Sequence, residues 1–307
     1  MAAYATKRIA AEKELDRLAM RVSSFVMGNR DPGRTLSAMK RVIFDDEGFE
    51  YDPDPENPDN FLLDRVIGRK RGNCLGLTLV YLTLAERIGL PLRAVYVPSH
   101  SFVRYEGDGA CINIETGEKG AERKDEWYAA KYFLKEGSPY LRSLGKKETI
   151  GLYLKSLGTA CSRKGSEEDA LHWYRKASIF HPGLPDIRYN AGVSYQRLGK
   201  NREAIDQYRS ALSLDPDMAV ARGNLAAALC NCGCVEDGVK EFLKALEINP
   251  SNATVRAGLA KAFFALGAYR EAAKHCDLAI KQGCRFDPSM LEVLNRYRAP
   301  GEFSTSH

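Results

Sequence analysis

The sequence has no apolar run close to the roughly 20 residues that a helix needs to cross a bilayer, so we expect no membrane segment. It also lacks a surplus of charge of one sign: 45 Lys and Arg face 40 Asp and Glu, a net charge of +5 over 307 residues. So small a surplus gives no electrostatic reason to expect nucleic-acid binding. The N-terminus has no apolar signal-peptide core, and we expect a cytoplasmic protein; a signal peptide already removed would leave the same sequence.

Eight cysteines are present in a chain too long to depend on disulfides, and we expect free thiols. Three of them, Cys230, Cys232 and Cys234, form a short alternating run. Structural zinc sites usually separate their thiols by two residues and need further ligands. No fourth ligand lies near in sequence, so we favour small residues in a helix turn over a metal site and expect no metal or cofactor.

The chain is long enough for two domains, and its first part mixes helices with a turn-rich loop. Apolar residues recur at helical spacing over residues 4–27, and Asp31-Pro32 begins a second helix with the same spacing. Residues 51–60 then carry four carboxylates among prolines and asparagines. The ligand spacing and central glycine of a calcium-binding hand are missing, so we predict an irregular surface loop.

A 34-residue period runs through the second half of the chain. Small residues recur at that interval at Gly158, Gly192, Ala226 and Ala260. Aromatic residues follow at Tyr174, Tyr208 and Phe242, and prolines at Pro182, Pro216 and Pro250. Small residues let two helices approach closely, the aromatic ring fills the gap and the proline ends the second helix. The pattern resembles the tetratricopeptide repeat family over residues 151–286, with a capping helix predicted at 287–298.

In that family the first helix of each repeat lines a concave groove. The residues that would line it here are Lys155, Tyr189, Asn190, Arg197, Asn224, Asn231 and Lys261. The resemblance places Asn190 and Asn224 where asparagines often hold the backbone of a bound peptide. Each residue alone is more simply a solvated polar group, but together they predict a protein or peptide partner.

Cys74 stands at the predicted start of a buried helix. Gly72 and Asn73 are turn and N-cap residues, an almost wholly apolar run follows, and Gly89 ends it. A thiol at a helix N-terminus meets the positive end of the helix dipole and unpaired backbone N–H groups. Both favour the thiolate, and the same N–H groups can stabilise an oxyanion.

The segment after this helix reads as a small antiparallel sheet. Residues 91–97 form a β-rich run, His100 begins the next strand, and a turn at 107–109 leads into a third. Alternation places Cys111, Asn113 and Glu115 on one face of that third strand. The hairpin brings it beside His100, so either Glu115 or Asn113 could orient the imidazole.

A cysteine at a helix start, a histidine on one strand and an acid on the next resemble the transglutaminase-like superfamily of papain-type thiol enzymes. Over about residues 36–127 the similarity is to a bacterial subgroup often joined to tetratricopeptide repeats. The resemblance implies that Cys74 is the nucleophile and His100 the general base and then acid. Glu115 would be the orienting residue where the family commonly has Asp, and Asn113 stays a competitor.

Three further side chains lie in or beyond this region. We predict a packing role for Cys111. We expect Trp127 and Tyr128 to pack under the domain junction, with an aromatic wall beside the site as the alternative.

The sequence therefore predicts an α+β transglutaminase-like domain, residues 1–148, followed by an all-α repeat solenoid, residues 149–307. The leading functional hypothesis is a cysteine-dependent acyl-transfer enzyme that hydrolyses a peptide or amide bond or passes the acyl group to an amine. Its repeats would bind a protein or peptide. Members of the subgroup often lack the nucleophile, so the alternative is a non-catalytic scaffold that uses both parts for protein interaction.

Overall fold

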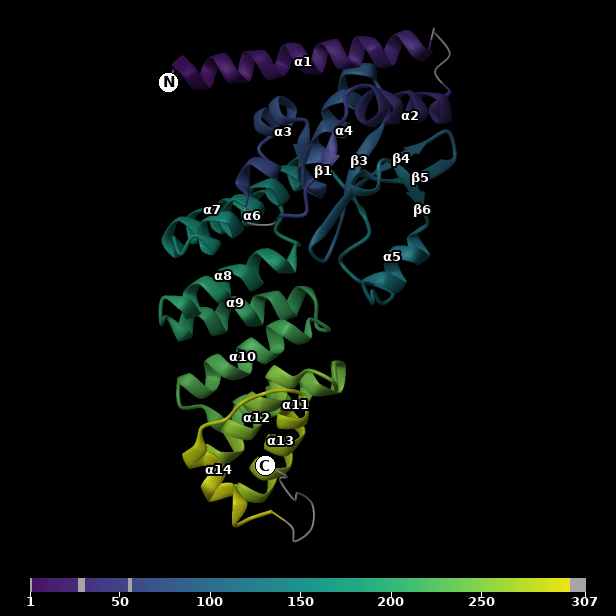
Figure 1. Ribbon diagram of the computed structural model, residues 1–307. Helices are drawn as coiled ribbons and strands as arrows, with labels where there is room; N and C mark the ends of the chain where they lie inside the picture. Colours follow the sequence, from purple (N-terminus) through teal and green to yellow (C-terminus); the bar gives the residue numbers. More distant parts are fainter. Residues whose placement is uncertain (1, 27–30, 55–56, 299–307) are drawn as a thin grey trace. The chain divides into compact units, whose positions relative to one another are not determined.

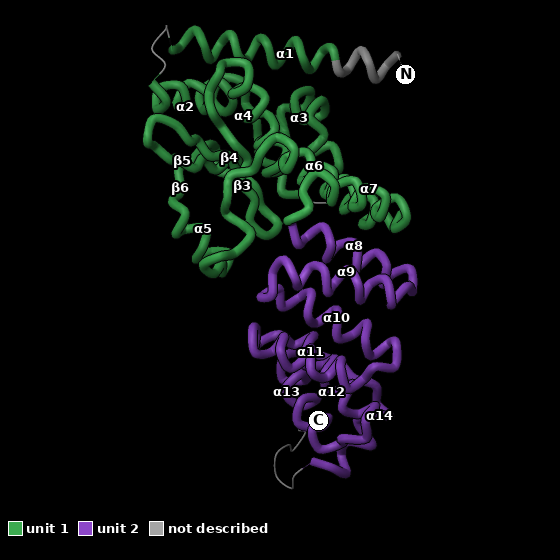
Figure 2. Tube along the Cα trace, turned by 180° about the vertical axis from the view of Figure 1, so that it is seen from behind, with its two compact units in different colours: residues 1–183 green, residues 184–307 purple. Residues whose placement is uncertain are grey.

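The computed structural model describes residues 2–26, 31–54 and 57–298, and the chain forms two compact units, residues 1–183 and 184–307 (Figure 2). The first pair of repeat-like helices, α6 (Lys146–Arg163) and α7 (Glu167–Phe180), groups with the N-terminal unit. The sequence predicts a domain boundary at 148/149, which lies in the first turn of α6. No helix in the described residues has the length and apolar character needed to cross a membrane.

Helices precede and cover a small sheet in the N-terminal unit (Figure 1). They are α1 (Ala2–Val26), α2 (Pro32–Lys40) with a π-helical extension (Arg41–Asp46), α3 (Leu63–Arg69), α4 (Cys74–Ile88) and α5 (Asp125–Lys131). Asp31 caps α2 by accepting a hydrogen bond from the N–H of Arg34. The two N-terminal helices predicted from apolar spacing are therefore present.

The main sheet has five antiparallel strands in the order β6-β5-β4-β3-β7 within the described residues. These are β3 (Leu92–Val97), β4 (His100–Gly107), β5 (Ala110–Glu115), β6 (Ala121–Arg123) and β7 (Ser143–Leu144). The β4–β5 turn contains Asp108 and Gly109 with φ of 52° and 75°. Two left-handed residues suit the twist of a tight hairpin, and the predicted small antiparallel sheet is confirmed.

A second, two-stranded sheet corrects the prediction that residues 51–60 lack regular structure. Strand β1 (Glu50–Tyr51) pairs in parallel with β2 (Arg71–Gly72), and Pro58–Asn60 form a 3-10 turn. A two-residue strand is too short to show a period in sequence. It forms because it pairs with a segment about 20 residues further along the chain, which no local pattern indicates. Residues 55–56 of this loop lie outside the described residues.

The main sheet is packed on both faces. On one face, apolar residues of α4 such as Leu77 and Tyr81 meet Val103 and Ile114, and α1 adds Leu18 to the same core. On the other face, Tyr128 of α5 packs with Val95, Val97 and Phe102. These two cores fix the helix that begins at the cysteine and the strands that follow it.

The C-terminal unit consists of antiparallel helical pairs. Its helices are α8 (Pro185–Arg197), α9 (Asn201–Leu214), α10 (Ala219–Asn231), α11 (Val235–Ile248), α12 (Ala253–Ala265), α13 (Tyr269–Lys281) and α14 (Pro288–Asn295). Gly192 faces Tyr208 so closely that an added Cβ would lie 2.6 Å from the ring. The small and aromatic positions of the 34-residue period thus meet, and α14 is the predicted capping helix.

Candidate active site

Cys74 is the first residue of α4, as predicted. The side chain of Asn73 caps the helix by accepting a hydrogen bond from the N–H of Gly76 at 3.0 Å, and Gly89 ends it with a φ of 74°. The first N–H groups of a helix have no carbonyl partner within it. Because Asn73 satisfies Gly76, the N–H groups of Cys74 and Leu75 are the ones for which the described residues give no hydrogen bond.

Neighbouring segments hold this helix start in place. The backbone N–H of Asn73 donates to the carbonyl of Asn60 at 2.8 Å, and a Cβ on Gly76 would overlap that same carbonyl oxygen. From the other side, the hydroxyl of Thr116 donates to the carbonyl of Cys74 at 3.3 Å. The cysteine is therefore positioned by the loop before it and by the segment that follows β5.

His100 begins β4, one residue after a sharp turn. Ser99 has a φ of 63°, and its N–H donates to the hydroxyl of Tyr96 at 3.2 Å. The Nε2 atom of His100 lies 2.9 Å from both carboxylate oxygens of Glu115. Since Nε2 is occupied by the carboxylate, Nδ1 is the ring nitrogen left for the thiol of Cys74.

Strand register explains why Glu115 reaches the imidazole. Val103 of β4 pairs with Ile114 of β5, so Glu115 stands opposite Phe102, diagonally next to His100 on the same face. The carboxylate is 2 % exposed and also accepts a hydrogen bond from the Tyr128 hydroxyl at 3.1 Å. Glu115 is thereby held in one orientation in a nearly dry environment.

Aromatic rings enclose the histidine. The ring of Tyr132 stacks on His100 with centroids 6.0 Å apart and an interplanar angle of 7°. Tyr128 stacks on Phe102 at 3.9 Å, and Trp127 meets Tyr128 edge-on at 4.9 Å. Tyr128, which also bonds Glu115, therefore lies beside the site, and Trp127 packs against the edge of its ring. Packing of the two residues under the domain junction stays a prediction.

The thiol and the imidazole shift each other's pKa. Burial by itself lowers the pKa of His100, but its hydrogen bonds with Cys74 and Glu115 and their negative charges outweigh burial and raise the pKa to about 9. Burial raises the pKa of Cys74, but the hydrogen bond and charge of His100 and contacts from Ser101 outweigh it, so the pKa is lowered. Between the two pKa values the pair is a thiolate and an imidazolium.

The site is not fully closed to solvent. Cys74 as a residue is half-buried, and 16 % of the His100 side chain is exposed. The pKa of the Cys74 thiol is lowered in these surroundings.

Asn113, the other candidate for orienting the imidazole, is bonded elsewhere. Its Oδ1 accepts from Nε of Arg104 at 2.6 Å, and its Nδ2 donates to Asp125 at 2.6 Å and to the carbonyl of Arg123 at 3.0 Å. Cys111, for which packing was predicted, is exposed. Among these same-face residues of β5, Glu115 is the one in contact with His100.

The predicted groove residues fall in both units. In the C-terminal unit, Asn224 of α10 donates to the hydroxyl of Tyr189 of α8 at 3.4 Å, while Arg197, Asn231 and Lys261 are exposed and Asn190 is half-buried. Lys155 lies on α6 of the N-terminal unit. It donates to the Tyr96 hydroxyl at 2.9 Å, with its ammonium 4.6 Å from the Tyr96 ring centroid.

The cysteine run lies at the predicted helix turn. Cys230 is in the last turn of α10, Cys232 is its C-cap, and Cys234 precedes α11. All eight cysteines are free thiols. Over residues 2–26, 31–54 and 57–298, no three His, Cys, Asp or Glu side chains gather as metal ligands.

Sequence reasoning missed several contributors to the site. Tyr132, Ser101 and Thr116 belong to no motif, and each reaches the site through strand or helix packing. The one available signal was the aromatic cluster at 127–132 following the strand that carries Glu115.

Removing the cap of α4 should weaken the helix start. Replacing Asn73 by alanine should lower the free energy of unfolding by about 1 kcal/mol and also raise the apparent pKa of Cys74, because the N-terminal turn loosens. The matched control is Asn252→Ala, which removes the analogous cap on Val255 of α12 in the other unit. Urea unfolding and Cys74 alkylation measure both effects; equal changes in Cys74 reactivity for the two variants would contradict the prediction.

Comparisons with known proteins find different families in the first and second parts of the chain. The sequence model of the transglutaminase-like superfamily matches residues 9–131, and tetratricopeptide repeat models match residues 185–218 and 233–288. F-box only protein 21 from Homo sapiens is 33 % identical over 95 residues, 30 % of this chain and 15 % of that protein. A UPF0162 protein from Xylella fastidiosa is 30 % identical over 81 residues, 26 % of this chain and 29 % of that protein. The chain thus spans less than a third of the length of either relative.

Solved structures similar to the chain include MamA and a tetratricopeptide repeat domain. A crystal structure of MamA is 20 % identical, with a TM-score of 0.41, and the match covers 48 % of this chain and 81 % of MamA. The first repeat domain of Spaghetti, bound to an HSP90 peptide, is 26 % identical with a TM-score of 0.38, covering 38 % of this chain and 95 % of that domain. From the family matches, the chain consists of a transglutaminase-like superfamily domain over residues 9–131 followed by tetratricopeptide repeats over residues 185–218 and 233–288.

Proposed function

We propose that the protein is a cysteine-dependent acyl-transfer enzyme in which Cys74, His100 and Glu115 form the catalytic triad. The observation that carries this proposal is that Nε2 of His100 lies 2.9 Å from both carboxylate oxygens of Glu115 while the imidazole also forms a hydrogen bond with Cys74. The order and contacts are those of a nucleophile, a base and an orienting group. A buried carboxylate aimed at a histidine beside the thiol favours the enzyme over the scaffold alternative.

The residues account for both halves of an acyl transfer. The Cys74 thiolate attacks the carbonyl carbon of an amide, forming a C–S bond while the N–H groups of Cys74 and Leu75 stabilise the oxyanion. The C–N bond then breaks, and the His100 imidazolium donates its proton to the leaving amine. Water or a second amine then attacks the thioester carbonyl and gives its proton to neutral His100. The C–S bond breaks, the acid or the new amide leaves, and Cys74 and His100 are again a thiolate and an imidazolium.

The repeats supply the second part of the proposal, a surface for a protein or peptide. Tetratricopeptide repeats are typical of protein-binding proteins, and polar side chains of neighbouring first helices meet at Tyr189 and Asn224. We place the partner on this face of the C-terminal unit, where Lys261 and Asn231 are also exposed. In this proposal the repeats bind the protein substrate on which Cys74 acts.

The pH dependence of Cys74 alkylation tests the enzymatic part. Iodoacetamide modifies the folded protein across a range of pH values, and mass spectrometry gives the rate at Cys74, with exposed Cys111 as internal reference. Cys74 should stay reactive well below the pKa of about 8.5 of a free thiol and show a second inflection near pH 9, where His100 loses its proton. If Cys74 instead titrates as a free thiol or does not react, the scaffold alternative replaces this proposal.

A further inference from the structure

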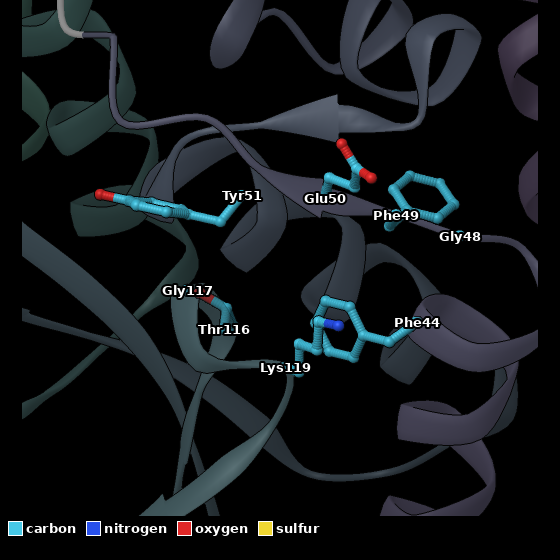
Figure 3. Close-up of a pocket in the computed structure, with 8 residues that line it drawn as sticks. All are labelled: Phe44, Gly48, Phe49, Glu50, Tyr51, Thr116, Gly117 and Lys119. Atoms are coloured by element: carbon cyan, nitrogen blue, oxygen red, sulfur yellow. The ribbon is translucent and has the colours of Figure 1, made fainter.

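A cavity of about 350 Å³ lies beside the triad and has no role in the mechanism above. Its lining residues are Phe44, Gly48, Phe49, Glu50, Tyr51, Thr116, Gly117 and Lys119 (Figure 3). The β1 segment supplies one side of the cavity, and the segment after β5, with Phe44, supplies the other. A volume of this size holds one side chain of a peptide but no folded segment.

Hydrogen bonds tie both walls to the segment that carries Cys74. On the first wall, Tyr51 pairs with Gly72, two residues before the cysteine, and the N–H of Asp52 donates to the Gly72 carbonyl at 2.9 Å. On the second wall, the hydroxyl of Thr116 donates to the carbonyl of Cys74 itself. The cavity is therefore tied to the nucleophile through two independent connections.

The same second wall touches the acid of the triad. The N–H of Gly117 donates to a carboxylate oxygen of Glu115 at 3.4 Å, and a Cβ on Gly117 would lie 3.3 Å from the Tyr51 ring. In agreement with this closeness, burial and the negative charges of Cys74 and Glu115 raise the pKa of Tyr51. The cavity wall therefore adjoins both the backbone of Cys74 and the carboxylate of Glu115.

The chemistry of the lining selects the occupant. Three aromatic rings contribute, and Tyr51, which is 41 % exposed, offers a free face. The only charged lining groups are Glu50 and Lys119, both exposed, of opposite sign and without an ion-pair partner among the described residues. A charged side chain would meet a like charge on one of them and an opposite charge on the other, so neither sign is attracted overall, whereas a neutral ring could pack on the exposed face of Tyr51.

We propose that this cavity is the substrate-specificity subsite and binds a neutral aromatic side chain next to the reacting carbonyl of a peptide acyl donor. This inference rests on the proposed function, because it requires Cys74 to be the nucleophile. It adds the class of substrate, which the triad alone does not specify.

Peptidyl chloromethyl ketones that differ only in the side chain next to the ketone test the subsite. In each probe the Cys74 sulfur attacks the methylene carbon, a C–S bond forms and chloride leaves. The phenylalanine probe should label Cys74 about tenfold or more faster than the alanine probe, as expected for filling an apolar pocket, and faster than the lysine and glutamate probes. Rates are divided by the iodoacetamide rate of the same protein, because that reagent is too small to need the cavity.

Two substitutions should change the order of the probe rates in different ways. Tyr51→Ala should reduce the preference for phenylalanine over alanine several-fold, because the exposed ring face is lost. Glu50→Lys should leave two cations at the cavity and make the glutamate probe faster than the lysine probe. Glu122→Lys, an equal change of charge on exposed β6 outside the cavity, is the control and should preserve the order found for the unaltered protein.

The outcomes separate the two proposals. Equal rates for all four probes at a reactive Cys74, or a fastest rate for a charged probe, would overturn the subsite while leaving the triad standing. A Cys74 that reacts with neither the ketones nor iodoacetamide would overturn the proposed function and the subsite with it.

Discussion

Replacing His100 by alanine should raise the apparent pKa of Cys74 to about 8.5 or above. Without the imidazolium, the half-buried thiolate loses its counter-ion and hydrogen bond, and burial, which raises the pKa, is left as the main influence. At pH 6.5 a thiol with a pKa of about 8.5 is only about 1 % thiolate. Iodoacetamide labelling of Cys74 as a function of pH gives the midpoint directly, and any acyl transfer at this pH should fall by about 100-fold or more.

The matched control is His172→Ala, since His172 is an exposed histidine on α7 of the same unit. This variant should leave the pH midpoint of Cys74 alkylation unchanged. A Cys74 midpoint that does not move in His100→Ala would mean that the histidine does not activate the thiol, whatever their separation.

Glu115→Gln should act on the histidine rather than on the thiol. His100 has a pKa raised to about 9, partly by this carboxylate, so the imidazolium is present below that pH and is lost as the pH rises through it. A neutral amide removes that attraction while burial still opposes the cation, so the second inflection should move below about 9; the hydrogen bond and charge of Cys74 remain and limit the fall. Asn113→Ala, which changes a residue bonded to Arg104 instead, should leave the inflection near pH 9.

Local chemistry made the cysteine helix and the repeats predictable. Asn73 and Gly89 mark the two ends of α4 by their capping properties, and the 34-residue spacing brings Gly192 onto Tyr208. These signals are read within one helix or one helical pair. For the same reason the hairpin turn at Asp108 and Gly109 could be located from two residues.

The choice between Glu115 and Asn113 could not be made from sequence, because alternation places both on the same face of β5. The register of β4 against β5 decides it, and register is a property of two strands and the cores they cover. The contacts of Lys155 likewise could not be predicted from a local sequence pattern. The repeat period places it in a groove, yet its ammonium lies on Tyr96 of β3, a contact that no local pattern records.

Arg104→Met should lower the free energy of unfolding of the N-terminal unit by about 3 kcal/mol. The Arg104 side chain is nearly buried, and its guanidinium donates to Asn113 at 2.6 Å, to Asp125 at 2.5 Å and to the carbonyl of Leu141 at 3.2 Å. Methionine keeps much of the apolar stem but leaves the Asn113 oxygen and the Leu141 carbonyl without this donor. Asp125 is half-exposed, so water can solvate its carboxylate and reduce the cost of losing that ion pair.

The strand partner of Arg104 provides the control. Arg93 pairs with Arg104 across β3 and β4, but its side chain is 55 % exposed and its nearest acid, on Glu106, lies 3.9 Å away. Arg93→Met should therefore change the free energy of unfolding by no more than about 0.5 kcal/mol, as measured by urea unfolding. Equal losses for the two variants would show that the buried polar cluster contributes nothing beyond the loss of an arginine. A large loss for Arg104→Met alone, with the Cys74 pKa unchanged at low denaturant, would assign the cluster to holding α5 on the sheet and leave the imidazole to Glu115.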